Sequence, residues 1–176
     1  MGKRSNFKRR AQDAYFTPAA GVLPLVPHLP EKFMFDEPCA GDGRLVRHIM
    51  DKCPEAGVGT TMDILPKCAS VLAGDALKDY APHPHSELII TNPPWTRQIL
   101  HPMIDRFRVM RPTWLLFDAD WMHTVQAEPY LKFCSMIVSV GRLSWMGNGK
   151  HGMDNCAWYR FESDPCETVF NGRAAK

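Results

Sequence analysis

The sequence has no apolar run that approaches the length of a membrane span, and no signal-peptide pattern follows Met1-Gly2-Lys3-Arg4. It also has no internal repeat and no low-complexity segment. These absences argue against a membrane-spanning protein and against a repeat protein. We expect a soluble chain that works in the cytoplasm, or in the host cytoplasm if a virus encodes it.

Paired cysteines are missing as well. None of the six cysteines forms a Cys-x-x-Cys pair, and no histidine stands at metal-finger spacing from them. We therefore expect reduced thiols, mostly buried, and no metal site.

Acidic residues are missing from the first ten positions, which hold Lys3, Arg4, Lys8, Arg9 and Arg10. Because the formal net charge of the whole chain is +2, the remainder carries −3. A basic arm on a slightly acidic body favours an anionic partner such as nucleic acid, although a solvated tail without a partner fits equally well.

The rest of the composition is that of one globular domain, with 45% hydrophobic and 23% charged residues in a chain of 176. We assign residues 1–12 to a basic arm expected to be flexible. Residues 13–170 form a single domain in this interpretation, and residues 171–176 form a tail.

The stretch that organises the chain is residues 88–95, Leu-Ile-Ile-Thr-Asn-Pro-Pro-Trp. Its apolar run predicts a buried strand, which must stop at the prolines because proline cannot continue a sheet ladder. Each proline also forces the preceding residue toward extended geometry, so the turn is stiff. Asn92 is therefore predicted to leave the carboxyl end of a strand, where ligands bind in open parallel sheets.

This corner suits group transfer to a nitrogen that is conjugated with a ring. The Asn92 side-chain oxygen and the Pro93 carbonyl can both accept hydrogen bonds from an NH₂ group, and neither Pro93 nor Pro94 has an N–H that would compete. Trp95 can stack on the ring that carries the amine. The alternative interpretation is a strand that ends in a proline turn with a tryptophan in the core.

A second strand-to-turn pattern lies nearer the amino terminus. Residues 33–38 predict the first strand, and residues 39–43, Cys-Ala-Gly-Asp-Gly, follow it before a helix over residues 44–52. Glycines at such a turn, Gly41 and Gly43, let the backbone approach a ligand and let the helix pack on the sheet. The dinucleotide pattern Gly-x-Gly-x-x-Gly is incomplete here.

Residues 13–18, Asp-Ala-Tyr-Phe-Thr-Pro, precede this strand and a short helix predicted over residues 19–26. Thr17 ahead of Pro18 fits a helix N-cap followed by proline at the first helical position.

Two acidic residues stand at predicted strand ends. Residues 57–64 predict the second strand, and Asp63 near its end can accept hydrogen bonds from both hydroxyls of a ribose. An Asp that ends a strand in a plain turn is the common alternative. A short element over residues 66–70 then leads to a third strand over residues 71–75, which ends at Asp75.

The second half of the chain continues the alternation of helices and strands. Apolar residues at helical spacing predict a helix over residues 97–109, which we interpret as core packing. Residues 113–118 predict a fifth strand that leaves the same sheet edge as Asn92. Asp118 and Trp121 are therefore candidates for lining a substrate crevice.

A helix over residues 124–131 and two last strands, residues 133–140 and 157–161, complete the pattern. The glycine-rich, polar connection between these strands is typical of a mobile loop that faces nucleic acid, and also of a plain hairpin loop. The candidates for nucleic-acid contacts in this connection are Lys150, His151 and Asn155.

Four patterns occur in one order: Tyr-Phe-Thr-Pro, Glu-Pro-Cys-Ala-Gly-Asp-Gly, two strand-end acids and Asn-Pro-Pro-Trp. In this order residues 13–165 resemble the S-adenosylmethionine-dependent DNA adenine-N6 methyltransferases of the gamma arrangement. The resemblance implies a class I methyltransferase fold, which is a Rossmann-like three-layer α/β sandwich with a mostly parallel seven-stranded sheet.

The resemblance also implies S-adenosylmethionine as the cofactor and the exocyclic amine of a flipped adenine in DNA as the acceptor. It implies that Glu37 faces the positive charge of the cofactor and that Ile64 and Asp75 contact its adenine. The implied catalytic corner comprises Asn92, Pro93, Pro94 and Trp95. The implied cofactor-binding residues are Tyr15, Thr17, Glu37, Gly41, Gly43, Asp63, Ile64, Asp75 and Asn92.

One departure from the family concerns target recognition. Adenine-N6 enzymes usually carry a separate recognition domain, but only 16 residues separate Asp75 from Asn92 here. We therefore expect little sequence specificity, or specificity supplied by loops, dimerisation or a partner, as in the compact solitary methyltransferases of phages and prophages. The sequence leaves the oligomeric state open.

Three alternatives remain open at this point. Enzymes that methylate the exocyclic amine of cytosine more often have serine in place of Asn92. RNA guanine and protein glutamine methyltransferases use a similar corner. The chain can also be a catalytically silent protein that binds nucleic acid or the cofactor.

Overall fold

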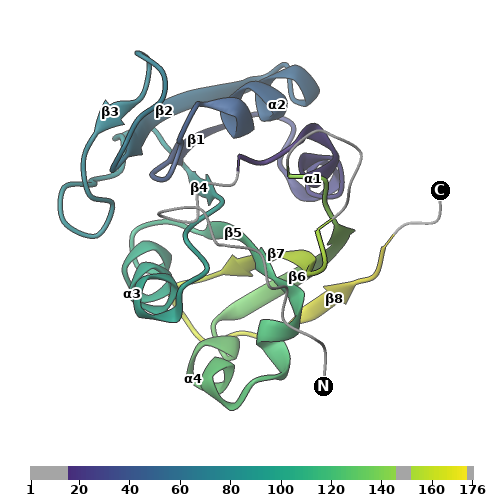
Figure 1. Ribbon diagram of the computed structural model, residues 1–176. Coiled ribbons are helices and arrows are strands. Elements are labelled where there is room, and N and C mark those ends of the chain that lie inside the picture. The colour runs from purple at the N-terminus through teal and green to yellow at the C-terminus, as the bar shows by residue number, and fades with distance from the viewer. Residues whose placement is uncertain (1–15, 146–151, 174–176) are drawn as a thin grey trace.

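The computed structural model describes residues 16–145 and 152–173, which form an eight-stranded sheet flanked by helices (Figure 1). The strands are β1 (Phe33–Glu37), β2 (Ala56–Asp63), β3 (Leu72–Ala73), β4 (Leu88–Thr91), β5 (Thr113–Asp118), β6 (Cys134–Arg142), β7 (Asn155–Phe161) and β8 (Val169–Asn171). The α-helices are α1 (Ala19–Val22), α2 (Arg44–Lys52), α3 (Arg97–Arg108) and α4 (Glu128–Leu131). The 3₁₀ turns are η2 (Val26–His28), η3 (Ala119–His123) and η4 (Val125–Ala127).

The strand order is β3-β2-β1-β4-β5-β7-β6-β8. The first five strands run parallel to their neighbours, β7 runs antiparallel to β5 and β6, and β8 runs parallel to β6. This arrangement confirms the predicted fold class of a mostly parallel α/β sandwich with an antiparallel strand near one edge. The sheet has one strand more than predicted, because residues 169–171 pair with β6.

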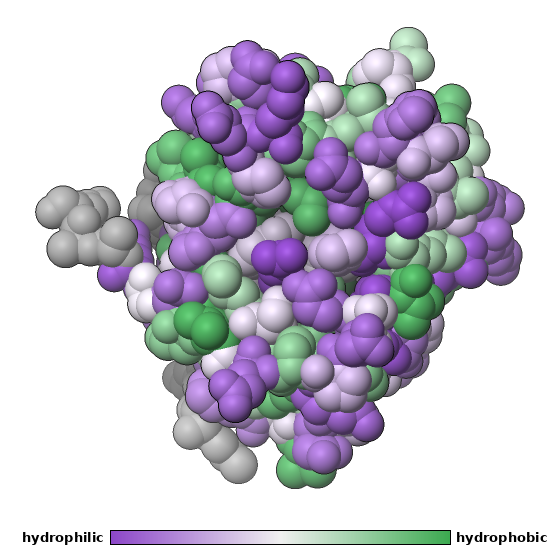
Figure 2. All heavy atoms as spheres, turned by 180° about the vertical axis from the view of Figure 1, so that it is seen from behind, coloured by the Kyte–Doolittle hydropathy of each residue, from purple (hydrophilic) through white to green (hydrophobic). Residues whose placement is uncertain are grey.

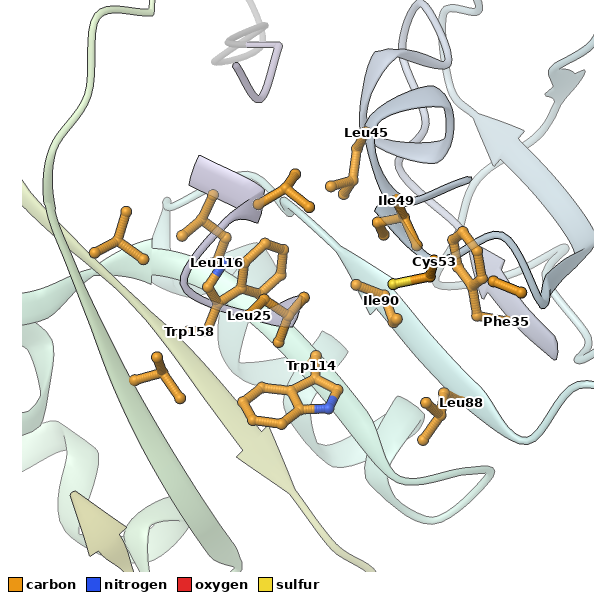
Figure 3. Close-up of a cluster of buried hydrophobic side chains, with 14 of the residues drawn as sticks. Leu25, Phe35, Leu45, Ile49, Cys53, Leu88, Ile90, Trp114, Leu116 and Trp158 are labelled. Atoms are coloured by element: carbon orange, nitrogen blue, oxygen red, sulfur yellow. The ribbon is translucent and has the colours of Figure 1, made fainter. Parts of the chain in front are cut away.

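Two hydrophobic clusters fill the two faces of the sheet and make the three layers. One cluster lies between the sheet and α1 and α2, and Figure 3 shows how its side chains converge from β1, β4, β5 and β7. The other lies between the sheet and α3, with α4 beside it. Each large apolar side chain buried in these clusters stabilises the fold by about 1.5–3 kcal/mol.

A buried carboxylate ties the first two strands to the connection that precedes β4. Asp36 is 0% exposed, and its Oδ1 accepts hydrogen bonds from the Thr60 amide (2.7 Å) and the Ser86 hydroxyl. Its Oδ2 accepts from the Tyr80 hydroxyl (2.8 Å) and the His83 amide (2.9 Å). Four donors satisfy a carboxylate that would otherwise be costly to bury.

Two local predictions are wrong. Residues 66–70 form bends and turns rather than a helical element. Thr17 is not the N-cap of the first helix, because α1 begins at Ala19 with Pro18 at the cap position and no side-chain cap hydrogen bond. The helix predicted over residues 19–26 is correspondingly shorter.

The surface is mixed in character. Figure 2 shows a face on which hydrophilic residues predominate and hydrophobic residues lie scattered among them. Among the described residues, no helix has the length and apolar composition that crossing a bilayer requires.

Candidate active site

The predicted site residues gather at one edge of the sheet. The parallel strands β1, β2, β4 and β5 all end at this edge, so Glu37, Asp63, Asn92 and Asp118 leave it together. The chain runs outward from β1 in one direction to β2 and β3 and in the other to β4 and β5. Ligands of open α/β sheets bind at such a reversal of strand order, which here lies between β1 and β4.

A small hollow marks this reversal point. Its volume is about 20 Å³, and its walls bring together three residues predicted from the sequence, Thr17, Glu37 and Asn92. The remaining lining residues are Phe16, Cys39, Ala40, Asp42 and Leu45. The structure thus brings Thr17 and Glu37, which are predicted to bind the cofactor, next to Asn92, which is predicted to bind the substrate amine.

Glu37 is the most unusual residue of this hollow. Its side chain is 1% exposed, and Oε2 has no hydrogen-bond partner among the described residues. Burial raises the pKa of Glu37 well above its usual value, a backbone hydrogen bond from Val46 opposes this, and the negative charges of Asp63 and Asp42 raise the pKa further. A buried acceptor without a donor is a position that a cationic ligand can stabilise.

The glycine turn between β1 and α2 needs its glycines. Gly41 and Gly43 have φ angles of 54° and 72°, a left-handed conformation that residues with a Cβ rarely adopt. A Cβ on Gly41 would also lie 2.7 Å from the ring of Phe16. The Phe16 ring therefore rests directly on the backbone where the sequence predicted a ligand to approach.

Asp63 fixes this turn from the end of β2. Its Oδ2 accepts a hydrogen bond from the Gly41 amide (2.8 Å), and its Oδ1 accepts one from the Leu65 amide (2.8 Å). Both oxygens keep a further lone pair for a ligand hydroxyl. Ile64, directly after Asp63, is 59% exposed and offers an apolar surface beside the turn.

Asp75 lies two residues beyond β3 and is engaged within its own turn. Its Oδ1 accepts from the Leu77 amide (2.9 Å), and its Oδ2 forms an ion pair with Lys78 (3.0 Å). The Leu77 hydrogen bond and the Lys78 ammonium lower the pKa of Asp75 below its usual value. Its predicted contact with the adenine of a cofactor stays a prediction.

The corner after β4, which the sequence predicts to be catalytic, is held by its own tryptophan. The Trp95 indole N–H donates to the Asn92 Oδ1 at 3.2 Å, and both side chains are half-buried. This bond orients the Asn92 amide and holds its oxygen at the end of β4. Trp95 also packs against both core clusters, which stiffens the corner together with buried Pro93 and half-buried Pro94.

Sequence reasoning missed Trp145 at this corner. Its ring lies edge-on to the ring of Trp95, with centroids 5.8 Å apart and planes at 77°. A Cβ added at Gly152, across the connection from β6 to β7, would lie 3.3 Å from the Trp145 ring, and the Gly152 amide donates a hydrogen bond to the Leu143 carbonyl. A tryptophan five residues after the strand predicted over residues 133–140, in a glycine-rich connection, was the signal that could have pointed to it.

The remaining predicted residues are scattered. Asp118 ends β5 half-buried, and burial raises its pKa. Trp121 is 2% exposed, donates its indole N–H to His101 (3.1 Å) and lies in the cluster on the α3 face. Asn155 is exposed at the first residue of β7. Tyr15, Lys150 and His151 lie outside the described residues.

A larger open hollow of about 550 Å³ lies along the outer side of α3. Apolar side chains make most of its wall, and it contains none of the residues predicted for a site. We place the chemistry at the smaller hollow because the convergent polar groups are there.

No protein-family model matches this sequence, and neither does any curated protein. Solved structures do match. A proposed class I S-adenosylmethionine-dependent methyltransferase from Listeria monocytogenes is 11% identical with a TM-score of 0.57, and the match covers 89% of this chain and 63% of that one. A dimethyladenosine transferase from Plasmodium falciparum is 16% identical with a TM-score of 0.54, covering 86% and 63%.

The M protein of the type I restriction enzyme EcoKI is 9% identical with a TM-score of 0.52, and the match covers 85% of this chain and 45% of that one. The chain thus spans less than two thirds of the length of each of these proteins. At these identities the likeness establishes the fold, and the fold of this chain is that of the class I S-adenosylmethionine-dependent methyltransferases.

Proposed function

We propose that this protein transfers the methyl group of S-adenosylmethionine to the exocyclic amine of adenine in DNA. One observation carries the proposal. At the point where the strand order reverses, Glu37 and Asn92 line the same hollow, and the buried Oε2 of Glu37 has no hydrogen-bond partner among the described residues. A site that suits the cationic methyl donor therefore lies next to a site that suits the amine that receives the methyl group.

The residues present fit this cofactor. S-adenosylmethionine supplies an activated methyl group on a sulfonium and also carries an ammonium group, a ribose and an adenine. Glu37 suits the positive charge because its Oε2 is buried and unmatched. Asp63 has lone pairs for ribose hydroxyls next to Gly41, and exposed Ile64 can cover one face of an adenine.

The hollow must widen to accept a molecule of this size. Its present volume of about 20 Å³ is near the space of a single water. Phe16 fills the place above Gly41 and contacts Arg44 through its ring at 5.5 Å. Binding thus requires the Phe16 ring to move away from the glycine turn.

Catalysis in this proposal is mostly positioning. Asn92 and the Pro93 carbonyl accept the two amine hydrogens, which directs the nitrogen lone pair toward the methyl group. Trp95 holds the Asn92 amide through its indole N–H and keeps the acceptor in place. The methylated nitrogen is briefly cationic and sheds its proton to solvent, so no base with a shifted pKa is needed before attack.

Two further observations support a nucleic-acid substrate. The first ten residues carry five positive charges and no negative one, which suits a phosphate backbone. The structural neighbours include a dimethyladenosine transferase and the M protein of a restriction enzyme. DNA rather than RNA, and adenine rather than cytosine, remain parts of the proposal.

The test is methyl transfer from labelled S-adenosylmethionine to DNA, RNA and protein, with the modified base identified by mass spectrometry. We expect N6-methyladenine in DNA. Asn92→Ala should lower the turnover at least about a hundredfold, as loss of a group that acts in the transition state does, while cofactor binding is kept. Gln98→Ala, which removes an exposed amide from the first turn of α3, is the matched control.

Each other outcome points to a different function. Methylation of cytosine, RNA or protein would change the proposed substrate and leave the proposed mechanism unchanged. Cofactor binding without transfer to any of them would favour the silent binding protein. Full activity of the Asn92 variant would remove Asn92 from the mechanism.

A further inference from the structure

The strand register places Asp118 on the same face of the sheet as Asn92. Thr91 on β4 pairs with Leu115 on β5, so Asn92 lies level with Leu116. Leu116 belongs to the cluster under α1 and α2, and alternate residues of a strand share a face. Asp118 therefore projects on this face, about 7 Å farther along the strand. The hollow lined by Asn92 opens on the same side, since α2 contributes to its wall.

The Asp118 carboxyl has one engaged oxygen and one that remains available. Its Oδ1 accepts a hydrogen bond from the Asp120 amide at 3.0 Å and caps η3. Its Oδ2 makes no hydrogen bond among the described residues. The titratable or charged groups around the carboxyl come from several elements: Arg97 of α3, Asp120 of η3, Asp154 ahead of β7, and Cys156 and Tyr159 of β7.

We propose that Asp118 reads the ring of the target base, by donating a hydrogen bond from its carboxylic acid to the ring nitrogen beside the amine that Asn92 and Pro93 hold. This inference rests on the proposed function and adds a specificity-determining residue to it. Adenine has an unprotonated nitrogen on either side of its amine, N1 and N7, and both accept hydrogen bonds.

The protonation state of the carboxyl decides which base it accepts. A carboxylic acid donates to adenine, whereas an ionised carboxylate would face the lone pair of N1 or N7 and repel it. Guanine differs, because its amine stands between an N1–H donor on one side and the N3 acceptor on the other. Burial raises the pKa of Asp118, and the negative charges of Asp120 and Asp154 raise it further, while the Asp120 amide and the Arg97 guanidinium oppose this. The net shift is toward the protonated form, which is the donor.

Three variants separate this role from the capping role. Asp118→Asn keeps an acceptor for the Asp120 amide and has permanent N–H donors. Asp118→Ala removes both. Glu128→Gln changes an exposed carboxylate at the start of α4, whose charge is not among those that shift the pKa of Asp118, and is the matched control.

The probe is a fluorescent single-stranded oligonucleotide with one adenine, compared with the same strand carrying 1-deazaadenine or 7-deazaadenine. Binding is measured by anisotropy in the presence of sinefungin, a cofactor analogue without a transferable methyl group. We expect the wild type to bind one deaza strand roughly five- to tenfold more weakly than the adenine strand, the effect of one hydrogen bond. Asp118→Ala should bind all three strands equally, and Asp118→Asn and Glu128→Gln should behave as the wild type.

The pH dependence gives a readout that a cap alone would not change. As pH rises through the pKa of Asp118 the donor is lost, so wild-type affinity for the adenine strand should fall, whereas Asp118→Asn should keep its affinity. An equal deaza effect in the wild type and Asp118→Ala overturns the inference while leaving the proposed function intact. Binding of sinefungin but of no oligonucleotide refutes a nucleic-acid substrate and this inference with it.

Discussion

The substitution Glu37→Gln tests the site through two opposite effects, one on stability and one on cofactor affinity. Gln is nearly isosteric with Glu and cannot ionise. Where wild-type Glu37 is ionised, it is a buried charge with one oxygen that has no hydrogen-bond partner among the residues that the structure describes. An unsatisfied buried group of this kind costs about 1–3 kcal/mol. At pH values where wild-type Glu37 is ionised, Glu37→Gln should therefore have a free energy of unfolding about 1–3 kcal/mol higher than the wild type.

The sign of the pH dependence follows from the raised pKa of Glu37 in the folded protein. The unfolded chain has a pKa near 4.5, so between that value and the folded-state pKa the folded protein binds more protons. Its free energy of unfolding therefore falls as pH rises through this window. Below pH 4.5 the wild type and Glu37→Gln should be equally stable, and the gap should open above it. Urea denaturation at a series of pH values measures this difference.

Cofactor affinity should change in the opposite direction. A hydrogen bond to a charged group contributes about 1.5–3 kcal/mol, so removing the counter-charge should weaken S-adenosylmethionine binding roughly 10- to 150-fold. Isothermal titration calorimetry measures it. Glu55→Gln, at an exposed position after α2, is the matched control and should change neither quantity. A Glu37→Gln protein that is less stable at high pH and binds the cofactor as well as the wild type would refute the reasoning.

Three further substitutions probe the scaffold of the site. Asp36→Ala leaves four donors, two of them buried, without their acceptor and should lower the free energy of unfolding by about 3–5 kcal/mol. Tyr80→Phe removes one of these hydrogen bonds and should cost about 1 kcal/mol. Equal losses for the two variants in chemical denaturation would contradict this. Gly41→Ala places a Cβ against Phe16 on a residue with a positive φ, so the free energy of unfolding should fall by at least about 1 kcal/mol and cofactor binding should weaken. An unchanged melting temperature would contradict the expected strain. Trp95→Phe removes the indole N–H that donates to Asn92, so kcat should fall roughly tenfold while the KM for the cofactor stays unchanged. If only the KM for the cofactor changes, Trp95 acts in cofactor binding and does not position Asn92.

The elements that build the site were predictable from the sequence because their signals are local. The β1, β4 and β5 strands are short apolar runs that end at a turn, a proline or an acid, and the structure confirms them to within one residue. The helix α2 begins at Arg44 directly after the glycine turn, and α3 ends one residue before the predicted boundary. Periodicity and turn chemistry act within a few residues, so a single sequence contains them.

The structure alone decided features that depend on residues far apart in the chain. The strand β8 has an exposed, short sequence, and it exists because β6 offers its backbone for pairing. Asp36 looked like an ordinary strand residue, yet its donors come from 24 to 50 residues away. Trp145 meets Trp95 across 50 positions of sequence.

The sequence by itself therefore determined which residues end the strands and what chemistry they can perform. Only the tertiary structure decided that one Glu37 oxygen lacks a partner in the part of the chain that is described, that Trp95 holds Asn92, and that Asp118 shares a face with Asn92. The physical reason is that strand pairing sets which ends become neighbours, and burial sets the protonation and hydrogen bonding of each group once its neighbours are in place.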